Sequence, residues 1–524
     1  AIVPEFRLVA RTGDITVNAG ARIGWATNNE TSERNPWIRL EAAGNIVVNA
    51  GIYALNRISL TAGWGTGVGN ITINSTGQLV VSAADAADRR IELVAGLTSG
   101  NIILNGAAAE SAIIQAAGAS SIVLLAQNGS ITQTQGRVIG GTLATQSTNA
   151  TTLRTAIERV GSLTIADAVV ADATPRTING ILITGTGALN LTESDSILLD
   201  QVTTNTGNIT ITTTGAGDIA IHSIISTSGN VTLTAGGAIT DASPASDATL
   251  NIETPAHLTL VANTGIGANG VADLDVNVVS LQATNYVAGN IVIQDPNALT
   301  ISGPVNTHGG NGGISISVSA GALLVNANIG AHGSGNVTLT ADTGAFTQAA
   351  TTTISSSSGH LSINADTVSQ SGRLITADDG GISVVADVGA ITMADGANSE
   401  TIDGSIIYSA ATDVALAIVA SSTGDLTITA TTGAITDNTA AETPNLITTG
   451  QTTLTAATGI GTSGAGDIDT TIDTLAATNS ASGGIFIHET DALRINETGV
   501  RTLAGNGSID VRVEAGDLTA DAVV

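Results

Sequence analysis

Residues 207–240 read GNITITTTGAGDIAIHSIISTSGNVTLTAGGAIT, and this stretch decides the fold. Its aliphatic residues recur two positions apart in short runs: Ile209 and Ile211, Ile219 and Ile221, and Val231 and Leu233. A period of two places these side chains on one face of a β-strand and leaves the residues between them on the other. The glycine before a run permits a positive φ or a tight corner. The stretch therefore predicts short strands, each with one inward face, joined by tight turns.

The same phrase of glycine, a small polar residue and alternating aliphatic residues returns along the chain. It begins at Gly13, Gly44, Gly69, Gly207, Gly229, Gly335, Gly359, Gly389, Gly424 and Gly507. The main phrases lie about 22–31 residues apart with further short strands between them, a spacing that fits turns of two or three strands in a parallel β-helix. We therefore expect an all-β chain that forms an elongated β-solenoid. Tandem β-sandwich domains are the main alternative, because short strands separated by frequent turns also describe that fold.

The composition fits a narrow core. Charged residues make up 11% of the 524 residues and aromatic residues 2%, so small aliphatic side chains must fill the interior. The hydrophobic fraction of 42% is too high for a disordered chain. Cysteine is absent, which excludes disulfides and thiolate metal sites. No apolar run reaches the roughly 18 residues of a membrane-spanning helix, so we expect a chain that does not span a membrane.

Charge divides the chain into two regions. All 16 basic residues are arginines, and 12 of them lie in residues 1–176 together with 12 acidic residues and all 3 tryptophans. Residues 177–524 contain the other 4 arginines and 32 acidic residues, which accounts for the net charge of −28. We predict a charge-neutral, tryptophan-containing β-repeat region over 1–176 and an acidic β-solenoid over 177–524, with the boundary near residues 165–180. The negative charge repels phosphate, so we do not expect nucleic acid as a partner.

A longer repeat lies within the acidic region. Residues 264–301 match residues 458–495 at an offset of 194, and the match continues toward the C-terminus with one inserted residue. The second copy stops at Val524, whereas the first copy runs on for many residues. From this 194-residue super-repeat with an incomplete second copy we expect a chain cut from a longer tandem array; a second copy that is itself truncated is the alternative.

One segment departs from the strand pattern. Residues 147–163 read STNATTLRTAIERVGSL, in which Leu153, Ala156, Ile157 and Val160 have helical spacing. Ser147 and Thr148 provide capping side chains in front of them. We therefore predict one short helix near residues 148–160, covering an edge or a junction of the β-structure.

Two pairs of aspartates are candidate metal ligands. Asp273 and Asp275 recur in the second copy as Asp467 and Asp469. Alternate residues on a strand share a face, so each pair could bind a hard cation such as Ca²⁺. Calcium takes six or more oxygen ligands, and neither segment supplies an evident set, so an outward-facing acidic strand is the alternative. No other cofactor is expected.

The tryptophans are candidate contact residues. Trp25, Trp37 and Trp64 lie near several arginines in the neutral region, and such rings could form a sugar-binding or partner-binding patch by stacking. A cap that covers the first open turn of the solenoid is the alternative.

Catalytic motifs are missing. The six histidines have no metal-binding spacing and no GxSxG motif occurs. A lyase acting on acidic polysaccharide would need cations to neutralise its substrate, and the acidic region has few. We expect no enzymatic activity and no catalytic residues; a polysaccharide-active β-helix enzyme is the less favoured alternative.

The phrases GNITI at Gly207, GNVTLTAGGAIT at Gly229 and GDLTITATTGAIT at Gly424 resemble those of large bacterial surface proteins of the filamentous haemagglutinin type. The resemblance covers most of residues 13–518 and implies a right-handed parallel β-helix that is secreted to the bacterial cell surface or beyond. We expect an extracellular adhesin or structural rod with multivalent contacts to cell-surface receptors, glycans or copies of itself. A self-assembling filament, sheath or surface-layer subunit is the alternative.

Overall fold

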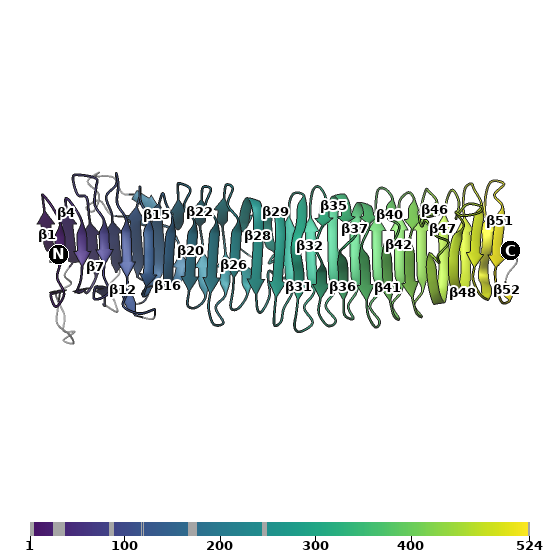
Figure 1. Cartoon of the computed structure of the whole chain (residues 1–524), viewed down its shortest axis with the longest axis horizontal. Helices are drawn as coiled ribbons and strands as arrows, with labels where there is room; N and C mark the ends of the chain where they lie inside the picture. The colour runs from purple at the N-terminus through teal and green to yellow at the C-terminus, as the bar shows by residue number, and fades with distance from the viewer. Residues whose placement is uncertain are drawn as a thin grey trace. The chain divides into compact units, whose positions relative to one another are not determined.

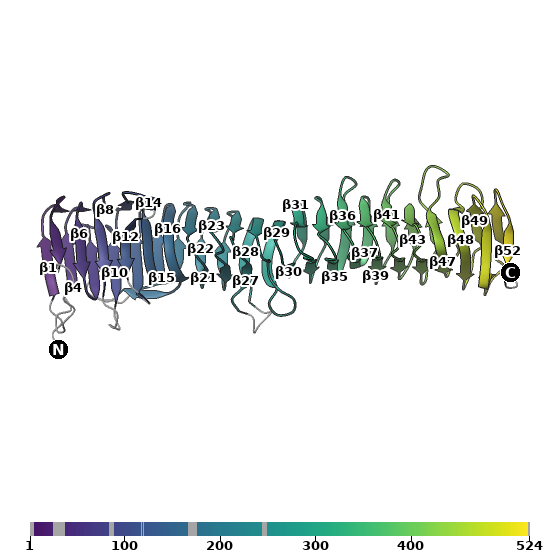
Figure 2. The ribbon, with the colours of Figure 1, turned by 90° about the horizontal axis from the view of Figure 1, so that it is seen from below.

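Parallel strands stacked turn upon turn account for nearly all of the regular structure. The computed structural model describes residues 5–24, 37–82, 89–109, 111–116, 118, 120–165, 176–243 and 249–521. These residues belong to two units, Ala1–Ala262 and Asn263–Val524, which together contain about 20 turns of a β-solenoid. Within each unit the strands lie side by side in both views (Figure 1 and Figure 2). The parallel pairing confirms the predicted solenoid and excludes the alternative of tandem β-sandwiches.

Three parallel ladders form the sides of the first unit. The first ladder contains β1 (Glu5–Ala10), β4 (Trp37–Ala42), β7 (Arg57–Thr61), β10 (Arg90–Val94), β13 (Ser121–Ala126), β15 (Arg137–Ser147), β19 (Ile181–Ile183), β22 (Val202–Thr204), β25 (Ile224–Ser226) and the start of β28 (Ile252–Ala262). The second contains β2 (Ile15–Val17), β5 (Ile46–Val48), β8 (Ile71–Ile73), β11 (Ile102–Asn105), β14 (Ile131–Gln135), the start of β16 (Thr151–Val160), β20 (Leu189–Glu193), β23 (Ile209–Thr213), β26 (Val231–Thr234) and the end of β28. The third contains β3 (Arg22–Gly24), β6 (Gly51–Ala54), β9 (Gln78–Val81), β12 (Ala112–Ala116), parts of β15 and β16, β21 (Ile197–Leu199), β24 (Ile219–Ile221) and β27 (Ile239–Asp241).

The second unit also has three ladders. The first contains β30 (Ile291–Asp295), β32 (Ile314–Val318), the start of β35 (Val337–Gln348), the start of β37 (Leu361–Gln370), β39 (Ile382–Ala386), β42 (Ile406–Ala410), β45 (Leu426–Ala430) and the ends of β47 (Leu446–Ala456), β48 (Ile468–Asn479) and β50 (Leu493–Thr502). The second contains the start of β31 (Leu299–Thr307), β33 (Leu323–Val325), the ends of β35 and β37, β40 (Ile391–Met393), β43 (Val414–Leu416), β46 (Ile435–Asp437), β49 (Ile485–Glu489) and β51 (Ile509–Val513). The third contains the ends of β29 (Leu274–Asn285) and β31, then β34 (Ile329–Ala331), β36 (Thr353–Ser356), β38 (Arg373–Thr376), β41 (Asn398–Thr401), β44 (Ile418–Ser421) and the starts of β47 and β48, while β52 (Leu518–Ala520) pairs with β50.

Inward-facing aliphatic residues form the core of each unit. Ile209 pairs in register with Val231, and Ile211 with Leu233, and all four side chains are fully buried. The threonine between each such pair is only half-buried, because its side chain points outward. The alternation read from the sequence thus places one aliphatic stripe of each turn against the next, and this burial is the main stabilising term.

The glycine–asparagine phrase forms two columns at one corner of the solenoid. A Cβ added to Gly229 would lie 2.2 Å from the carbonyl oxygen of Gly207 in the preceding turn. The next residue continues the second column, because the backbone N–H of Asn230 donates to Oδ1 of Asn208 at 3.0 Å. Gly229 has no positive φ, so the corner needs glycine for the close approach of two backbones.

The predicted helix near residues 148–160 is wrong. This segment is β16, in which Thr151, Leu153, Thr155 and Ile157 are buried in strict alternation. Because Thr151 and Thr155 occupy two of the inward positions, the apolar residues alone do not show the period of two. The described part of the chain contains no helix, and so none with the length and apolarity to cross a membrane.

A short antiparallel hairpin adds a second small core to the first unit. β17 (Leu163–Ile165) pairs with β18 (Arg176–Ile178), and Ile178 packs with Val94, Val123, Leu125 and Ala144. Residues 166–175, where part of the predicted charge boundary falls, lie outside the described residues.

Buried acidic side chains accept backbone and hydroxyl hydrogen bonds at the corners at which long strands bend. Glu193, at the end of β20, accepts hydrogen bonds from the Thr155 hydroxyl at 2.7 Å and from the Ile157 N–H at 3.1 Å. Asp295, at the end of β30, likewise accepts the N–H of Val278. Burial raises the pKa of Glu193 to about 7 and the pKa of Asp295 to about 6, although these hydrogen bonds oppose the shift. Both groups therefore take up protons in the folded state near neutral pH.

Replacing Glu193 by glutamine is expected to change the pH dependence of stability. The folded pKa is raised, so the stability that Glu193 contributes is fully present below its unfolded pKa of about 4.3 and is lost as the pH rises to about 7. The free energy of unfolding of Glu193→Gln relative to the wild type should therefore increase by about 1–3 kcal/mol between pH 5 and pH 7.5. Hydrogen exchange of residues 151–157 and 189–193 at the two pH values, corrected for the intrinsic pH dependence of exchange, measures this difference as a local free energy of unfolding. The exposed Glu253→Gln is the control, and an equal response of both variants would contradict the prediction.

Candidate metal centre

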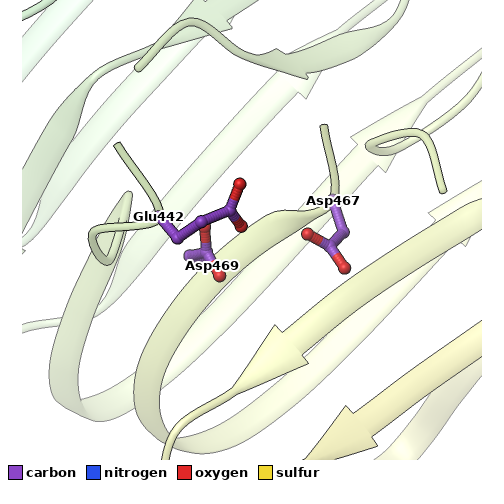
Figure 3. Close-up of side chains that lie close together, drawn as sticks. All are labelled: Glu442, Asp467 and Asp469. Carbon is purple, nitrogen blue, oxygen red and sulfur yellow. The ribbon is translucent and has the colours of Figure 1, made fainter. Parts of the chain in front are cut away.

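Three carboxylates meet at one corner of the second unit. Glu442 lies in the loop between β46 and β47, Asp467 directly precedes β48, and Asp469 is the second residue of that strand. One oxygen from each lies within 4.8 Å of the other two. Figure 3 shows the three side chains at this corner. Asp467 and Asp469 are buried and Glu442 is exposed.

Backbone pairing holds the Glu442 loop against β48. The N–H of Asn445 donates to the carbonyl oxygen of Asp469 at 2.8 Å, and the N–H of Asp469 donates to Oδ1 of Asn445 at 3.0 Å. The side-chain amide of Asn445 also donates to Oδ1 of Asp437 at 2.7 Å. The loop that carries Glu442 is therefore anchored at both ends within a few residues of the carboxylate.

The two oxygens of Asp469 have different surroundings. Oδ1 lies 3.0 Å from Nδ1 of His488, which comes from β49 in the next turn. Oδ2 is buried and has no hydrogen-bond partner among the described residues. Burial raises the pKa of Asp469, and the neighbouring Asp467 adds to the shift, whereas the hydrogen bond with His488 opposes it. A nearby cation would favour the ionised carboxylate and satisfy this oxygen.

The first copy of the super-repeat has the aspartates but a different neighbour. Asp273 precedes β29, and Asp275 lies within that strand and is buried. The position of His488 is occupied by Gln294, which pairs in register with Asp275. Residues 244–248, in the loop before β28, lie outside the described residues.

The sequence pattern identified two of the three clustered residues and missed Glu442. This residue lies in an irregular loop and belongs to no alternating run. Its position 25 residues before Asp467 is the signal that was available, because residues one turn apart in a solenoid are neighbours.

The predicted tryptophan patch has a different organisation. Trp37 lies in β4, and the guanidinium carbon of Arg57 is 4.3 Å from the centre of its ring, with Arg39 at 5.7 Å. Trp64 is half-buried in the turn after β7, and Trp25 lies outside the described residues. The Arg22 guanidinium stacks separately on Tyr53. The interactions that the structure gives for Trp37 are thus with arginines of its own ladder.

Two small cavities lie among the described residues of the first unit. One of about 100 Å³ is lined by Arg137, Arg154 and Glu193 among others, and one of about 220 Å³ lies between residues 75–78 and 106–113. Both are smaller than the usual pockets for small-molecule ligands.

Comparison of the chain with protein-family models, with curated proteins and with solved structures finds no match.

Proposed function

We propose that this chain is an extracellular adhesin or structural β-solenoid rod that acts through many weak surface contacts. The observation that supports this proposal is the in-register rows of polar side chains on the outer faces of the ladders. In the second unit Ser315, Thr338, Ser362 and Ser383 follow one another on four successive turns. Adjacent members of such a row are about 4.8 Å apart.

Regular rows of hydroxyls favour repeated contacts over one deep site. Each hydroxyl is a donor and an acceptor, so a row offers the same hydrogen-bonding group at every turn. A partner with its own repeating polar groups, such as a glycan chain, gains affinity from each further turn that it contacts. The parallel backbone pairing keeps these rows in register within each unit, so little ordering is required on binding.

Adhesion by this mechanism is expected to depend steeply on surface density. Beads coated with the purified chain at increasing density would be applied to an array of neutral and acidic oligosaccharides and to cultured epithelial cells. Retention should rise more than proportionally with density, because contacts made after the first are intramolecular. Beads coated with an acidic globular protein of similar net charge are the control. Absence of retention at every density on both surfaces would contradict an adhesive role.

Two other measurements separate the alternatives. Negative-stain microscopy should show isolated particles, whereas ordered fibres or lattices would favour a filament, sheath or surface-layer subunit. Incubation with an anionic polysaccharide should release no products. Product release that is lost on replacement of Asp273 or Asp467 would instead favour a polysaccharide-active enzyme.

A further inference from the structure

We propose that Glu442, Asp467 and Asp469 bind one calcium ion that fastens the loop before β47 to the start of β48. The three carboxylates come from two successive turns, and an oxygen of each lies within 4.8 Å of the others. A cation bound by all three would cross-link segments that are 25 residues apart in the sequence. This inference does not depend on the adhesive role.

The buried oxygen of Asp469 is an independent indication of a ligand. Only 4% of this side chain is exposed, and Oδ2 has no hydrogen-bond partner among the described residues. A buried carboxylate oxygen that lacks a partner is costly, since desolvation is not compensated. Because Oδ1 is directed to His488, the free oxygen is the one available to a cation.

The positive charges of the acidic region are engaged elsewhere. Its four arginines contact other groups: Arg373 pairs with Glu400, Arg494 with Asp521, Arg512 with Asp510, and Arg501 contacts Thr478. His488 is the one basic side chain that the structure pairs with the cluster among the described residues. Three carboxylates close together without an arginine repel one another, and a divalent cation would remove this repulsion.

The donor set favours calcium over magnesium and zinc. The carboxylates supply only oxygen ligands, and mono- and bidentate binding with added water provides the six to eight oxygens that Ca²⁺ takes. Glu442 is on an irregular loop, and Ca²⁺ accepts flexible ligand geometry more readily than Mg²⁺, which demands a near-ideal octahedron. The hydrogen bond between His488 and Oδ1 of Asp469 fixes the orientation of this carboxylate, as outer-shell partners of metal ligands do. With one ligand exposed, we expect weak binding, with a Kd of about 0.1–1 mM.

Calcium binding is tested by titrating the full chain, freed of metal with a chelator, with CaCl₂ at pH 7.5. Calorimetry should detect binding in the stated range, and the unfolding temperature should rise. Glu442→Gln and Asp467→Asn should each weaken binding about tenfold or more. Asp473→Asn is the matched control, because Asp473 is an exposed acid of the same strand outside the cluster, and it should bind like the wild type. MgCl₂ should bind more weakly than CaCl₂.

Hydrogen exchange of the wild type tests the proposal without a substitution that could itself disturb folding. Calcium should slow exchange in residues 438–446 and 467–470, and leave residues 207–235 of the first unit unchanged. The proposal is overturned if CaCl₂ gives no binding heat and no protection of these segments, if both variants bind like the wild type, or if magnesium binds as tightly as calcium.

Discussion

Replacement of Glu92 by glutamine is expected to lower the local free energy of unfolding of the first unit by about 3–5 kcal/mol. Glu92 lies in β10 and is fully buried. Its carboxylate pairs with Nη2 of Arg57 at 2.5 Å and with Nη1 of Arg90 at 3.0 Å, and these two arginines come from successive turns. Removal of the negative charge takes away the carboxylate that pairs with Arg57 and Arg90, and loss of one partner of a buried ion pair is far more costly than loss of an exposed pair.

Hydrogen exchange in residues 57–61, 90–94 and 121–126 is the appropriate measurement, because a stack of repeats loses stability locally and need not unfold in two states. Arg373→Gln is the matched control. It breaks the pair with Glu400, in which both side chains are about half exposed, so it should cost about 1 kcal/mol or less. Equal protection in the wild type and Glu92→Gln would show that the buried network does not stabilise the unit.

The fold could be predicted from the sequence because each turn repeats the same local chemistry. Alternation such as that of Ile209 and Ile211 decides which face is buried, and the recurring glycine marks the corner. The same logic failed at β16, where Thr155 occupies an inward position. Its hydroxyl is satisfied by Glu193, which lies 38 residues further along the chain. The spacing of hydrophobic residues within one segment does not reveal a partner so far away in the sequence.

The candidate metal centre could be predicted only in part for a similar reason. Asp467 and Asp469 form a local pattern on one strand, whereas Glu442 joins them through the stacking of two turns. Repetition itself was the available guide, since a residue one turn earlier becomes a neighbour. The different loop lengths between turns make the spacing irregular, and the exact neighbour therefore needs the register that the structure supplies.

Glycines of successive turns, such as Gly207 and Gly229, lie against each other at one corner of the solenoid and leave no room for a side chain at Gly229. Its N–H donates to the hydroxyl of Ser226 at 2.8 Å, and its carbonyl oxygen accepts from the hydroxyl of Thr254 at 2.7 Å. An added Cβ would lie 2.2 Å from the carbonyl oxygen of Gly207 and 2.5 Å from its carbonyl carbon. Gly207 and Gly229 each lie between strands of two ladders, so their backbone atoms cannot move aside as the end of a flexible side chain can.

Replacement of Gly229 by alanine is therefore expected to destabilise its turns by about 3 kcal/mol, at the upper end of the usual range for overpacking. Slower-exchanging amides in residues 207–213 and 231–234 should lose protection, because the strands β23 and β26 can no longer keep their spacing. Gly330→Ala is the control: Gly330 lies within β34, and a Cβ there would come no closer than 3.0 Å to the Asn306 side chain. That variant should be neutral or slightly stabilising, since alanine lowers the entropy of the unfolded chain. If Gly229→Ala proved as stable as Gly330→Ala, the glycine of the repeating phrase would have to be explained by something other than contact between successive backbones.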